Sequence, residues 1–178
     1  MAALLAVALA ACSSSSPPRK TQTASKPKPP ARTASASPAK PNANRSLANI
    51  QASGDGREVV MYALGLLDVG YKFGGSNPEA GLDCSGMAAF IYKNAVNVQL
   101  PHNARQIAET TKAIDLKKLR AGDMVFFNTM NRPYSHMGIY IGDGKFIHAP
   151  RTNSTIRVDT LASGYFADRL EGARTVFD

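Results

Sequence analysis

Residues 13–50 limit where this chain can fold, because they contain no acidic and no aromatic residue. The segment reads SSSSPPRKTQTASKPKPPARTASASPAKPNANRSLANI and holds seven of the eleven prolines of the 178-residue chain. Such a segment cannot bury enough apolar surface to offset the entropy lost on ordering, so we expect it to be disordered. Folding is then confined to the rest of the chain.

Most of the positive charge lies in the same segment. Residues 13–50 carry seven Lys and Arg toward the net charge of +8, whereas residues 51–178 carry fourteen basic and thirteen acidic side chains. The basic segment either keeps the chain soluble and extended or attracts anionic polymer and lipid, and the sequence favours neither. No nucleic-acid partner is expected, because no aromatic residues are interleaved with the charge for bases to stack on.

The residues before this segment have the composition of a signal-peptide core. From Met1 to Ala11 the chain contains only Met, Ala, Leu and Val. This run is about half of the roughly 20 apolar residues that a membrane-spanning helix needs. We therefore interpret residues 1–11 as a signal peptide and not as an anchor helix, although no Lys or Arg precedes the run as usual.

The sequence Leu9-Ala10-Ala11-Cys12 resembles the lipobox of bacterial lipoproteins, in which the cysteine is diacylated and becomes the new N-terminus. The resemblance implies lipidation of Cys12 and a membrane-anchored tether over residues 12–50. The chain contains only one other cysteine, Cys84. If Cys12 is lipidated, Cys84 stays a free thiol in an oxidising compartment, which requires a functional reason.

Residues 51–178 are sufficient for one domain of ordinary size, and its two halves differ in pattern. The first half has amphipathic helical patterns at 55–70, 84–96 and 103–111. After Gly122, short β-branched or aromatic runs bounded by turns predict strands at 124–127, 136–141, 145–149, 155–158 and 174–177. Helices followed by tightly connected strands favour an α+β domain with an antiparallel sheet.

Cys84 stands at the start of the second predicted helix, in LDCSGMAAFIYKNA. A thiol at the first helical position lies near unpaired backbone N–H groups and the positive end of the helix dipole, which both favour the thiolate. That placement suits a nucleophile better than a structural cysteine.

The histidines His136 and His148 flank a Gly-Asp-Gly turn at 142–144 and can cooperate only if they share a face of the sheet. A two-residue loop would place His148 opposite Ile139 and the two histidines on opposite faces. A three-residue loop would place His148 opposite Gly138 and both histidines on one face, within reach of each other. We predict the three-residue loop with its last glycine left-handed, because this is a common hairpin form.

These three side chains are the minimum for covalent acyl transfer: a nucleophile, a general base and a group that orients the base. Cys84 would be the nucleophile, His136 the base and later the acid that protonates the leaving amine, and His148 the orienting group. The same side chains could instead bind zinc, although no two of them lie close in sequence.

Five motifs in order, YKFGG, LDCSG, LPHNARQ, RAGDMVFF and SHMGIYIGDGKFIHAP, resemble the NlpC-type cell-wall endopeptidases, a papain-like family of peptidoglycan hydrolases. The resemblance spans residues 56–177. It implies a papain-like α+β fold with helices packed on an antiparallel sheet, the nucleophile at a helix N-terminus, and no cofactor. It also implies Cys84 as nucleophile, His136 as base and His148 as third catalytic residue.

The same resemblance implies roles for residues around the thiol. Tyr71 would lie near the oxyanion, and Asp83 and Ser85 beside the amine and backbone of the substrate. The alternatives are a packed aromatic for Tyr71 and a simple helix cap for Asp83. His102 stands where relatives usually have an arginine, and we interpret it as an exposed loop histidine.

The resemblance implies a monomeric lipoprotein peptidase that cleaves bonds next to D-amino acids in peptidoglycan stem peptides or cross-links. The bonds that the family commonly cleaves are D-glutamyl to diaminopimelate and the D-alanyl cross-link. With Ser13 after the lipid-bearing Cys12, the resemblance to lipoproteins implies the periplasmic face of an outer membrane. The alternative is a peptidoglycan-binding lipoprotein or an acyltransferase of the same fold.

Overall fold

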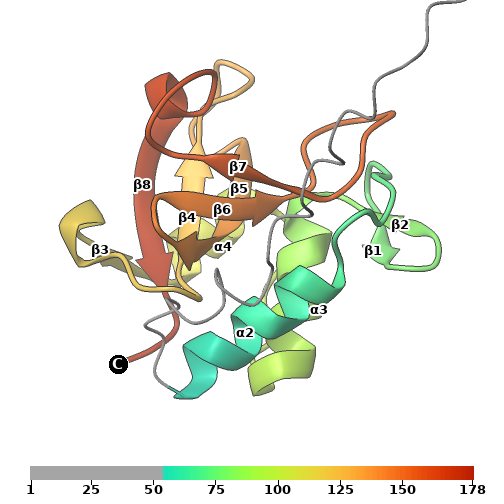
Figure 1. The fold of residues 1–178 in the computed structure, drawn as a ribbon, viewed down its shortest axis with the longest axis horizontal. Helices are drawn as coiled ribbons and strands as arrows, with labels where there is room; N and C mark the ends of the chain where they lie inside the picture. The colour runs from blue at the N-terminus through green and yellow to red at the C-terminus, as the bar shows by residue number, and fades with distance from the viewer. Residues whose placement is uncertain (1–53) are drawn as a thin grey trace, which may run out of the picture. The chain divides into compact units, whose positions relative to one another are not determined.

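The computed structural model describes residues 54–178, which form helices packed on an antiparallel sheet (Figure 1). The predicted signal peptide at 1–11, the lipidation of Cys12 and the tether at 12–50 lie outside the described residues. No helix within the described part of the chain has the length and apolar character needed to cross a membrane.

The helices come first along the chain. They are α2 (Gly54–Gly65), α3 (Cys84–Val96) and α4 (Ala104–Thr110). The predicted second and third helices are confirmed, but the first is shorter than the predicted range 55–70. Asp68 adopts a left-handed conformation, with φ at 67°, and its N–H donates to the carbonyl of Ile156. Pairing with this distant segment replaces the last turn of the predicted helix.

Helix α3 begins at Cys84 because Asp83 caps it. The Asp83 backbone is extended, and its carboxylate accepts a hydrogen bond from the N–H of Gly86 at 2.8 Å. The helix ends at Asn97, which is left-handed with φ at 55° and whose N–H donates to the carbonyl of Tyr92. The cap places Cys84 at the first helical position, as predicted.

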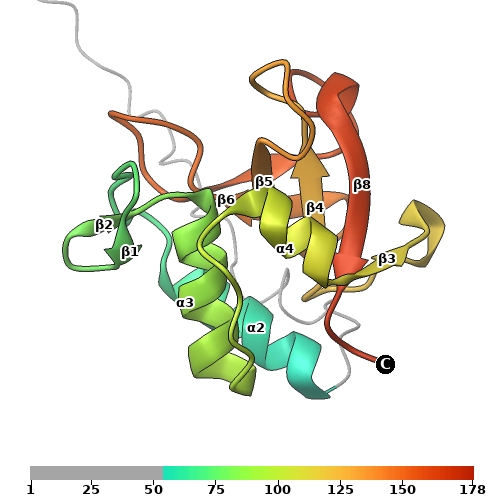
Figure 2. The same cartoon turned by 180° about the vertical axis from the view of Figure 1, so that it is seen from behind.

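The main sheet has six strands in the order β3-β8-β4-β5-β6-β7, with every neighbouring pair antiparallel. The strands are β3 (Lys112–Ile114), β4 (Met124–Phe127), β5 (His136–Gly142), β6 (Lys145–His148), β7 (Arg157–Thr160) and β8 (Leu170–Thr175). A separate hairpin of β1 (Ser76–Asn77) and β2 (Gly81–Leu82) lies near the start of α3 (Figure 2). The predicted α+β, papain-like class with an antiparallel sheet is confirmed.

The predicted strands differ from the observed ones mainly at the end of the chain. The range 124–127 is confirmed as β4, and 136–141 and 145–149 each differ from β5 and β6 by one residue. The last two predicted strands are displaced, because β7 begins at Arg157 and β8 ends at Thr175. Strand β3 was not predicted; its partner, β8, lies far away in sequence.

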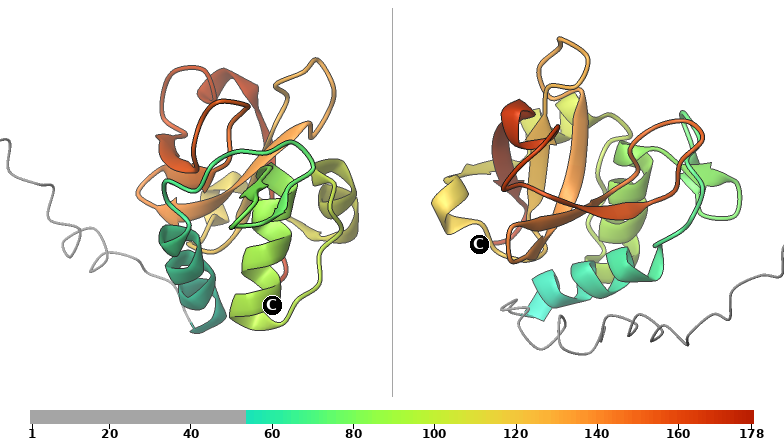
Figure 3. Two further views of the ribbon diagram at one scale, coloured as in Figure 1. Left: turned by 90° about the vertical axis from the view of Figure 1, so that its right-hand side faces the viewer. Right: turned by 45° about the horizontal axis from the view of Figure 1, so that its top comes forward.

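Alternation along the strands buries both faces of the sheet. Met124 and Phe126 pack into the core that also contains Met87 and Ile91 of α3. All three helices contact β5, and α2 and α3 lie side by side (Figure 3). The other face holds a second cluster of Val125, Phe127, Phe146 and Ala173. The start of α3 is thereby fixed against the strand that begins at His136.

Candidate active site

The hairpin that carries the two histidines has a two-residue loop, so the predicted three-residue loop is wrong. Gly142 pairs with Lys145, and the two loop residues Asp143 and Gly144 are both left-handed, with φ at 52° and 66°. This combination is that of a type I′ turn, for which Asp-Gly is a preferred sequence.

A β-bulge nevertheless places the two histidines on the same face of the sheet. The register shifts between Tyr140 and Gly142, so Ile139 pairs with Ile147. The extra residue, Ile141, reverses the alternation of side chains on one strand only. His148 therefore lies opposite Gly138, and the predicted common face of the two histidines is confirmed.

The two imidazoles are hydrogen-bonded to each other. Nε2 of His136 lies 2.8 Å from Nδ1 of His148, and the ring centroids are 5.1 Å apart at 77°. Gly138 leaves room for this pair, because a Cβ at that position would lie 2.7 Å from the carbonyl oxygen of Ile147 and 3.1 Å from Cβ of His148.

Gly138→Ala should therefore destabilise the protein by about 1–3 kcal/mol, because a backbone atom would have to move to admit the methyl group. Gly65→Ala is the matched control, since a Cβ there meets nothing within 4 Å. Urea unfolding of the full chain measures both changes. Equal midpoints for Gly138→Ala and the wild type would show that the close approach is unimportant.

The hydrogen-bonded chain continues to an aspartate that sequence reasoning missed. Nε2 of His148 lies 2.8 Å from Oδ2 of Asp159 on β7. Nε and Nη2 of Arg157 donate to the same oxygen at 3.0 and 2.9 Å. The predicted strand ended at residue 158, so the only available signal was an acidic residue one position beyond a β-branched run.

The histidine pair is enclosed by aromatic rings. Phe166 stacks on His136 with centroids 5.7 Å apart and meets the His148 ring edge-on at 4.6 Å. Burial lowers the pKa of His136 to about 3, with His148 acting in the same direction, and burial lowers the pKa of His148 to about 4 despite the hydrogen bond to Asp159. Both imidazoles are therefore neutral at neutral pH.

These lowered pKa values predict a loss of stability in mild acid. Below pH 6.5 the two histidines become protonated in the unfolded chain but stay neutral in the folded protein. The free energy of unfolding therefore falls as pH decreases toward about 4. The loss is about 1.4 kcal/mol per pH unit for each histidine. Urea midpoints of the full chain between pH 7 and 4.5 measure it. A double variant, His136→Asn with His148→Asn, should have a flatter pH dependence, and an unchanged slope would contradict the assignment.

The thiol of Cys84 is held in its protonated form. Burial raises its pKa to about 11, with the Asp83 carboxylate acting in the same direction. Hydrogen bonds from the N–H groups of Met137, Ser85 and Cys84 itself oppose this shift. The expectation of a thiolate at the helix start is contradicted, because the desolvation of the thiol and the adjacent carboxylate outweigh the backbone N–H groups.

The Met137 N–H places the sulfur of Cys84 beside the start of β5, immediately next to His136. Within residues 54–178 the structure shows no hydrogen bond between this thiol and the imidazole of His136. The two groups are therefore neighbours in a neutral state and not a preformed ion pair.

The remaining predicted residues lie around Cys84. Burial raises the pKa of the Tyr71 phenol, and the electrostatic effects of Cys84 and Asp83 add to the shift, so the phenol lies close to both. Oδ1 of Asp83 accepts hydrogen bonds from the Ser85 hydroxyl at 3.0 Å and the Gly86 N–H, while Oδ2 accepts from the Gly74 N–H at 2.9 Å. Tyr71, Asp83 and Ser85 are thus brought together with the thiol.

His102 is an exposed loop residue, as the sequence suggested, but it also contacts Asp83. Its Nε2 lies 3.0 Å from Oδ1 of Asp83, and its side chain is 35% exposed. Burial alone would raise the pKa of Asp83, but hydrogen bonds from Gly86, His102 and Ser85 lower it below its ordinary value. His102 therefore helps to keep the Asp83 carboxylate charged.

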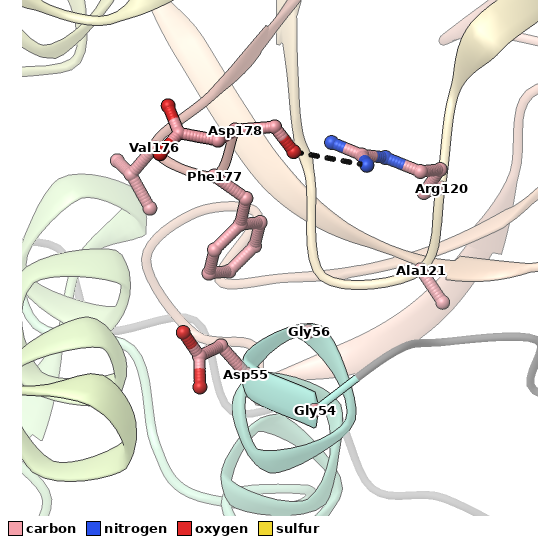
Figure 4. A pocket seen from close by; sticks show the side chains of 8 residues that line it. All are labelled: Gly54, Asp55, Gly56, Arg120, Ala121, Val176, Phe177 and Asp178. Atoms are coloured by element: carbon pink, nitrogen blue, oxygen red, sulfur yellow. Dashed lines mark hydrogen bonds between the residues drawn. The ribbon is translucent and has the colours of Figure 1, made fainter.

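Of two surface hollows within residues 54–178, one adjoins these residues. The nearer one runs along α3 and is lined by Ser76, Gly86, Ala89, Phe90, Lys93, Asn94, Gln99, Leu100 and His102. The other lies between the start of α2 and the last residues of the chain, where Arg120 donates to the carbonyl of Asp178 (Figure 4). None of the predicted site residues lines either hollow, but Gly86 and His102 of the first both bond to Asp83, so the first is the better candidate for a substrate groove.

The donor atoms do not favour the zinc alternative. In the part of the chain that the structure describes, no group of three or more His, Cys, Asp and Glu side chains is arranged to hold a metal ion. The facing nitrogens of His136 and His148 are directed at each other and not at a common point.

Comparison with known proteins gives two informative relatives. The chain is 39% identical over 109 residues to Murein DD-endopeptidase MepH of Escherichia coli (strain K12), covering 60% of this chain and 40% of that protein. It is 35% identical over 117 residues to Gamma-DL-glutamyl hydrolase of Bacillus subtilis (strain 168), covering 65% of this chain and 28% of that protein. The chain spans less than half the length of either relative.

Solved structures show the same fold. The NlpC/p60 domain of peptidoglycan hydrolase SagA matches with a TM-score of 0.60 and 26% identity over 68% of this chain and 98% of that one. An NLP/P60-family protein similar to lipoprotein, from Staphylococcus aureus subsp. aureus Mu50, matches with a TM-score of 0.63 and 29% identity over 71% of this chain and 43% of that one. The NlpC/P60 family model matches residues 68–175, which include the thiol, both histidines and Asp159, and the chain belongs to the NlpC/P60 family.

Proposed function

We propose that this protein is a cysteine-type endopeptidase that hydrolyses peptide bonds in peptidoglycan. The observation that carries the proposal is the hydrogen-bonded pair His136–His148 beside the first residue of α3, where Cys84 supplies the only thiol in residues 54–178. The names of the relatives support the substrate class, since they describe a murein endopeptidase and a peptidoglycan hydrolase.

The first half of the reaction forms a thioester. The Cys84 thiol gives its proton to the free ring nitrogen of His136 while the sulfur attacks the carbonyl carbon of the scissile amide. Because desolvation raises the pKa of the Cys84 thiol and lowers that of His136, we propose that this proton transfer accompanies the attack. The resulting oxyanion accepts hydrogen bonds from the Cys84 N–H and the Tyr71 phenol. The C–N bond then breaks, and His136 protonates the leaving amine.

The second half regenerates the thiol. His136 takes a proton from water as the water oxygen attacks the thioester carbonyl, and the C–S bond breaks. The sulfur recovers its proton from His136, and the acyl product leaves as a carboxylic acid that loses its proton to water. His148 keeps the His136 ring in place through both halves. No cofactor takes part in these steps.

The scissile bond lies next to a D-amino acid. Two relatives suggest different bonds, because one is named a DD-endopeptidase and the other a gamma-DL-glutamyl hydrolase. We assign Asp83 and Ser85, whose carboxylate and hydroxyl are hydrogen-bonded to each other, to the amine and backbone of the stem peptide. The groove along α3 continues from His102 and offers Lys93 as a cation for a stem-peptide carboxylate.

Digestion of purified sacculi by the full chain tests this function. We expect soluble muropeptides whose mass spectra show one new carboxylate on a D-amino acid and one new free amine, with masses that identify the bond. Sacculi that bind the protein but stay intact would instead indicate a binding module. Transfer of the acyl group to an added amine without release of the free acid would indicate an acyltransferase.

We also propose that the chain acts as a monomeric lipoprotein at the periplasmic face of the outer membrane, with Cys12 lipidated after removal of residues 1–11. In cells fed radiolabelled palmitate, the wild-type protein should become labelled, and Cys12→Ala should lose the label entirely. Cys84→Ala is the matched control and should keep it. Equal labelling of the wild type and Cys12→Ala would contradict the lipid anchor.

A further inference from the structure

We propose that Asp159 fixes the tautomers of both histidines and so makes Nδ1 of His136 the base. Asp159 is a positioning residue: it lies at the far end of the chain of hydrogen bonds and acts through His148. The effect on catalysis rests on the proposed function, whereas the tautomers of the two histidines do not depend on it.

Asp159 fixes the direction of the hydrogen bond that it makes with His148. An ionised carboxylate can only accept hydrogen bonds, so Nε2 of His148 must donate to Oδ2 of Asp159, 2.8 Å away. Arg157 donates twice to the same oxygen, at 2.9 and 3.0 Å. This guanidinium keeps the carboxylate charged and fixes its position.

A neutral imidazole carries a proton on only one of its two nitrogens. With its proton on Nε2, His148 has a bare Nδ1 that can only accept a hydrogen bond. Nε2 of His136 lies 2.8 Å from that atom and must therefore donate. The proton of His136 is then on Nε2, which leaves Nδ1 bare. Nδ1 is the one nitrogen able to take the proton of Cys84.

Burial of the two imidazoles leaves no water to provide other hydrogen-bond partners. His148 is fully buried and His136 nearly so, and Phe166 covers both rings. The charged and titratable groups that face the chain of hydrogen bonds are Asp159 and Arg157 on β7 and Asp83 beside the thiol. Water is excluded from the buried nitrogens, so the protein's own acceptor at Asp159 sets the direction.

Without the Asp159 carboxylate, the direction of the hydrogen bonds between the two histidines should no longer be fixed. An amide at position 159 can donate as well as accept, so His148 can carry its proton on Nδ1 and donate toward His136. The proton of His136 then occupies Nδ1, and the base is blocked. The carboxylate also stabilises the positive charge that His136 acquires during the reaction, and an amide cannot do so.

The test compares Asp159→Asn with the wild type, using the full chain labelled with ¹⁵N-histidine. We expect the imidazole ¹⁵N spectrum of the wild type to show both histidines protonated on Nε2, and that of Asp159→Asn to show protonated Nδ1 atoms. The rate of muropeptide release at saturating substrate should fall by about 10- to 100-fold with KM nearly unchanged. Asp143→Asn, an exposed change on the neighbouring hairpin loop, is the control and should change neither readout.

The spectra and the digestion separate the two proposals. If the wild type does not digest sacculi, the proposed function fails, while the spectra still decide the role of Asp159. Identical imidazole spectra in the wild type and Asp159→Asn would overturn the inference even in an active enzyme. If Asp159→Asn unfolds, Asp159→Glu tests the same point: retention of the carboxylate should preserve the wild-type tautomers, and protonated Nδ1 atoms in that folded variant would overturn it.

Discussion

Replacing Cys84 by serine should reduce muropeptide release from sacculi by about 10⁴-fold or more. The serine hydroxyl is nearly the size of the thiol, so α3 and its cap should be unchanged. A hydroxyl is much harder to deprotonate than a thiol, and burial makes His136 a weak base by lowering its pKa to about 3. The substituted side chain therefore fills the site of the nucleophile without acting as one.

The measurement for Cys84→Ser is the initial rate of release of soluble fragments, with circular dichroism to show that the fold is intact. Cys12→Ser is the matched control, since it removes the other cysteine of the chain and should digest sacculi at the wild-type rate. Activity of Cys84→Ser within tenfold of the wild type would contradict covalent catalysis by this residue.

His136→Gln should cause the second largest loss, about 10³- to 10⁴-fold in kcat. Glutamine can keep one hydrogen bond toward Nδ1 of His148, but it cannot take the thiol proton or protonate the leaving amine. Binding should be affected little, because the candidate substrate groove is lined by other residues. The expected pattern is therefore a loss in kcat with KM nearly unchanged.

His102→Gln provides the comparison for His136→Gln, because it changes the remaining histidine of the chain, which contacts Asp83 and not the thiol. It should alter KM more than kcat. A His136→Gln protein that keeps kcat and loses only affinity would assign His136 to substrate binding and leave the reaction without its base.

Features set by neighbouring residues were predictable from the sequence. Helix α3 starts at Cys84 because Asp83 and an apolar helical repeat stand next to each other. Strand β4 follows from four consecutive apolar residues after a turn. The nucleophile, base and orienting group could therefore be selected, and the structure brings their elements together.

Features that depend on distant pairing were not predictable. The end of α2 is set by contact with Ile156, and β3 exists only because β8 pairs with it. Asp159 reaches His148 through the register of β6 and β7, which leaves no local signal in the sequence. The hairpin loop was mispredicted although Asp-Gly is typical of a two-residue turn, and the bulge at Ile141 left no local signal.

The electrostatic prediction failed for a related reason. At the start of α3 the desolvation of the Cys84 thiol and the adjacent Asp83 carboxylate outweigh the backbone N–H groups, and that desolvation depends on how α3 packs on β5. His102 shows the same limit, since a loop position gave no indication of its contact with Asp83.

The most direct test of covalent catalysis is a mass-spectrometric peptide map of the full chain, quenched with acid in the first turnovers on purified sacculi. We expect a stem-peptide fragment attached as a thioester to the peptide that contains Cys84, removed by hydroxylamine and missing from Cys84→Ser. Release of muropeptides by the wild type with no adduct on Cys84, together with undiminished release by Cys84→Ser, would contradict the proposed mechanism.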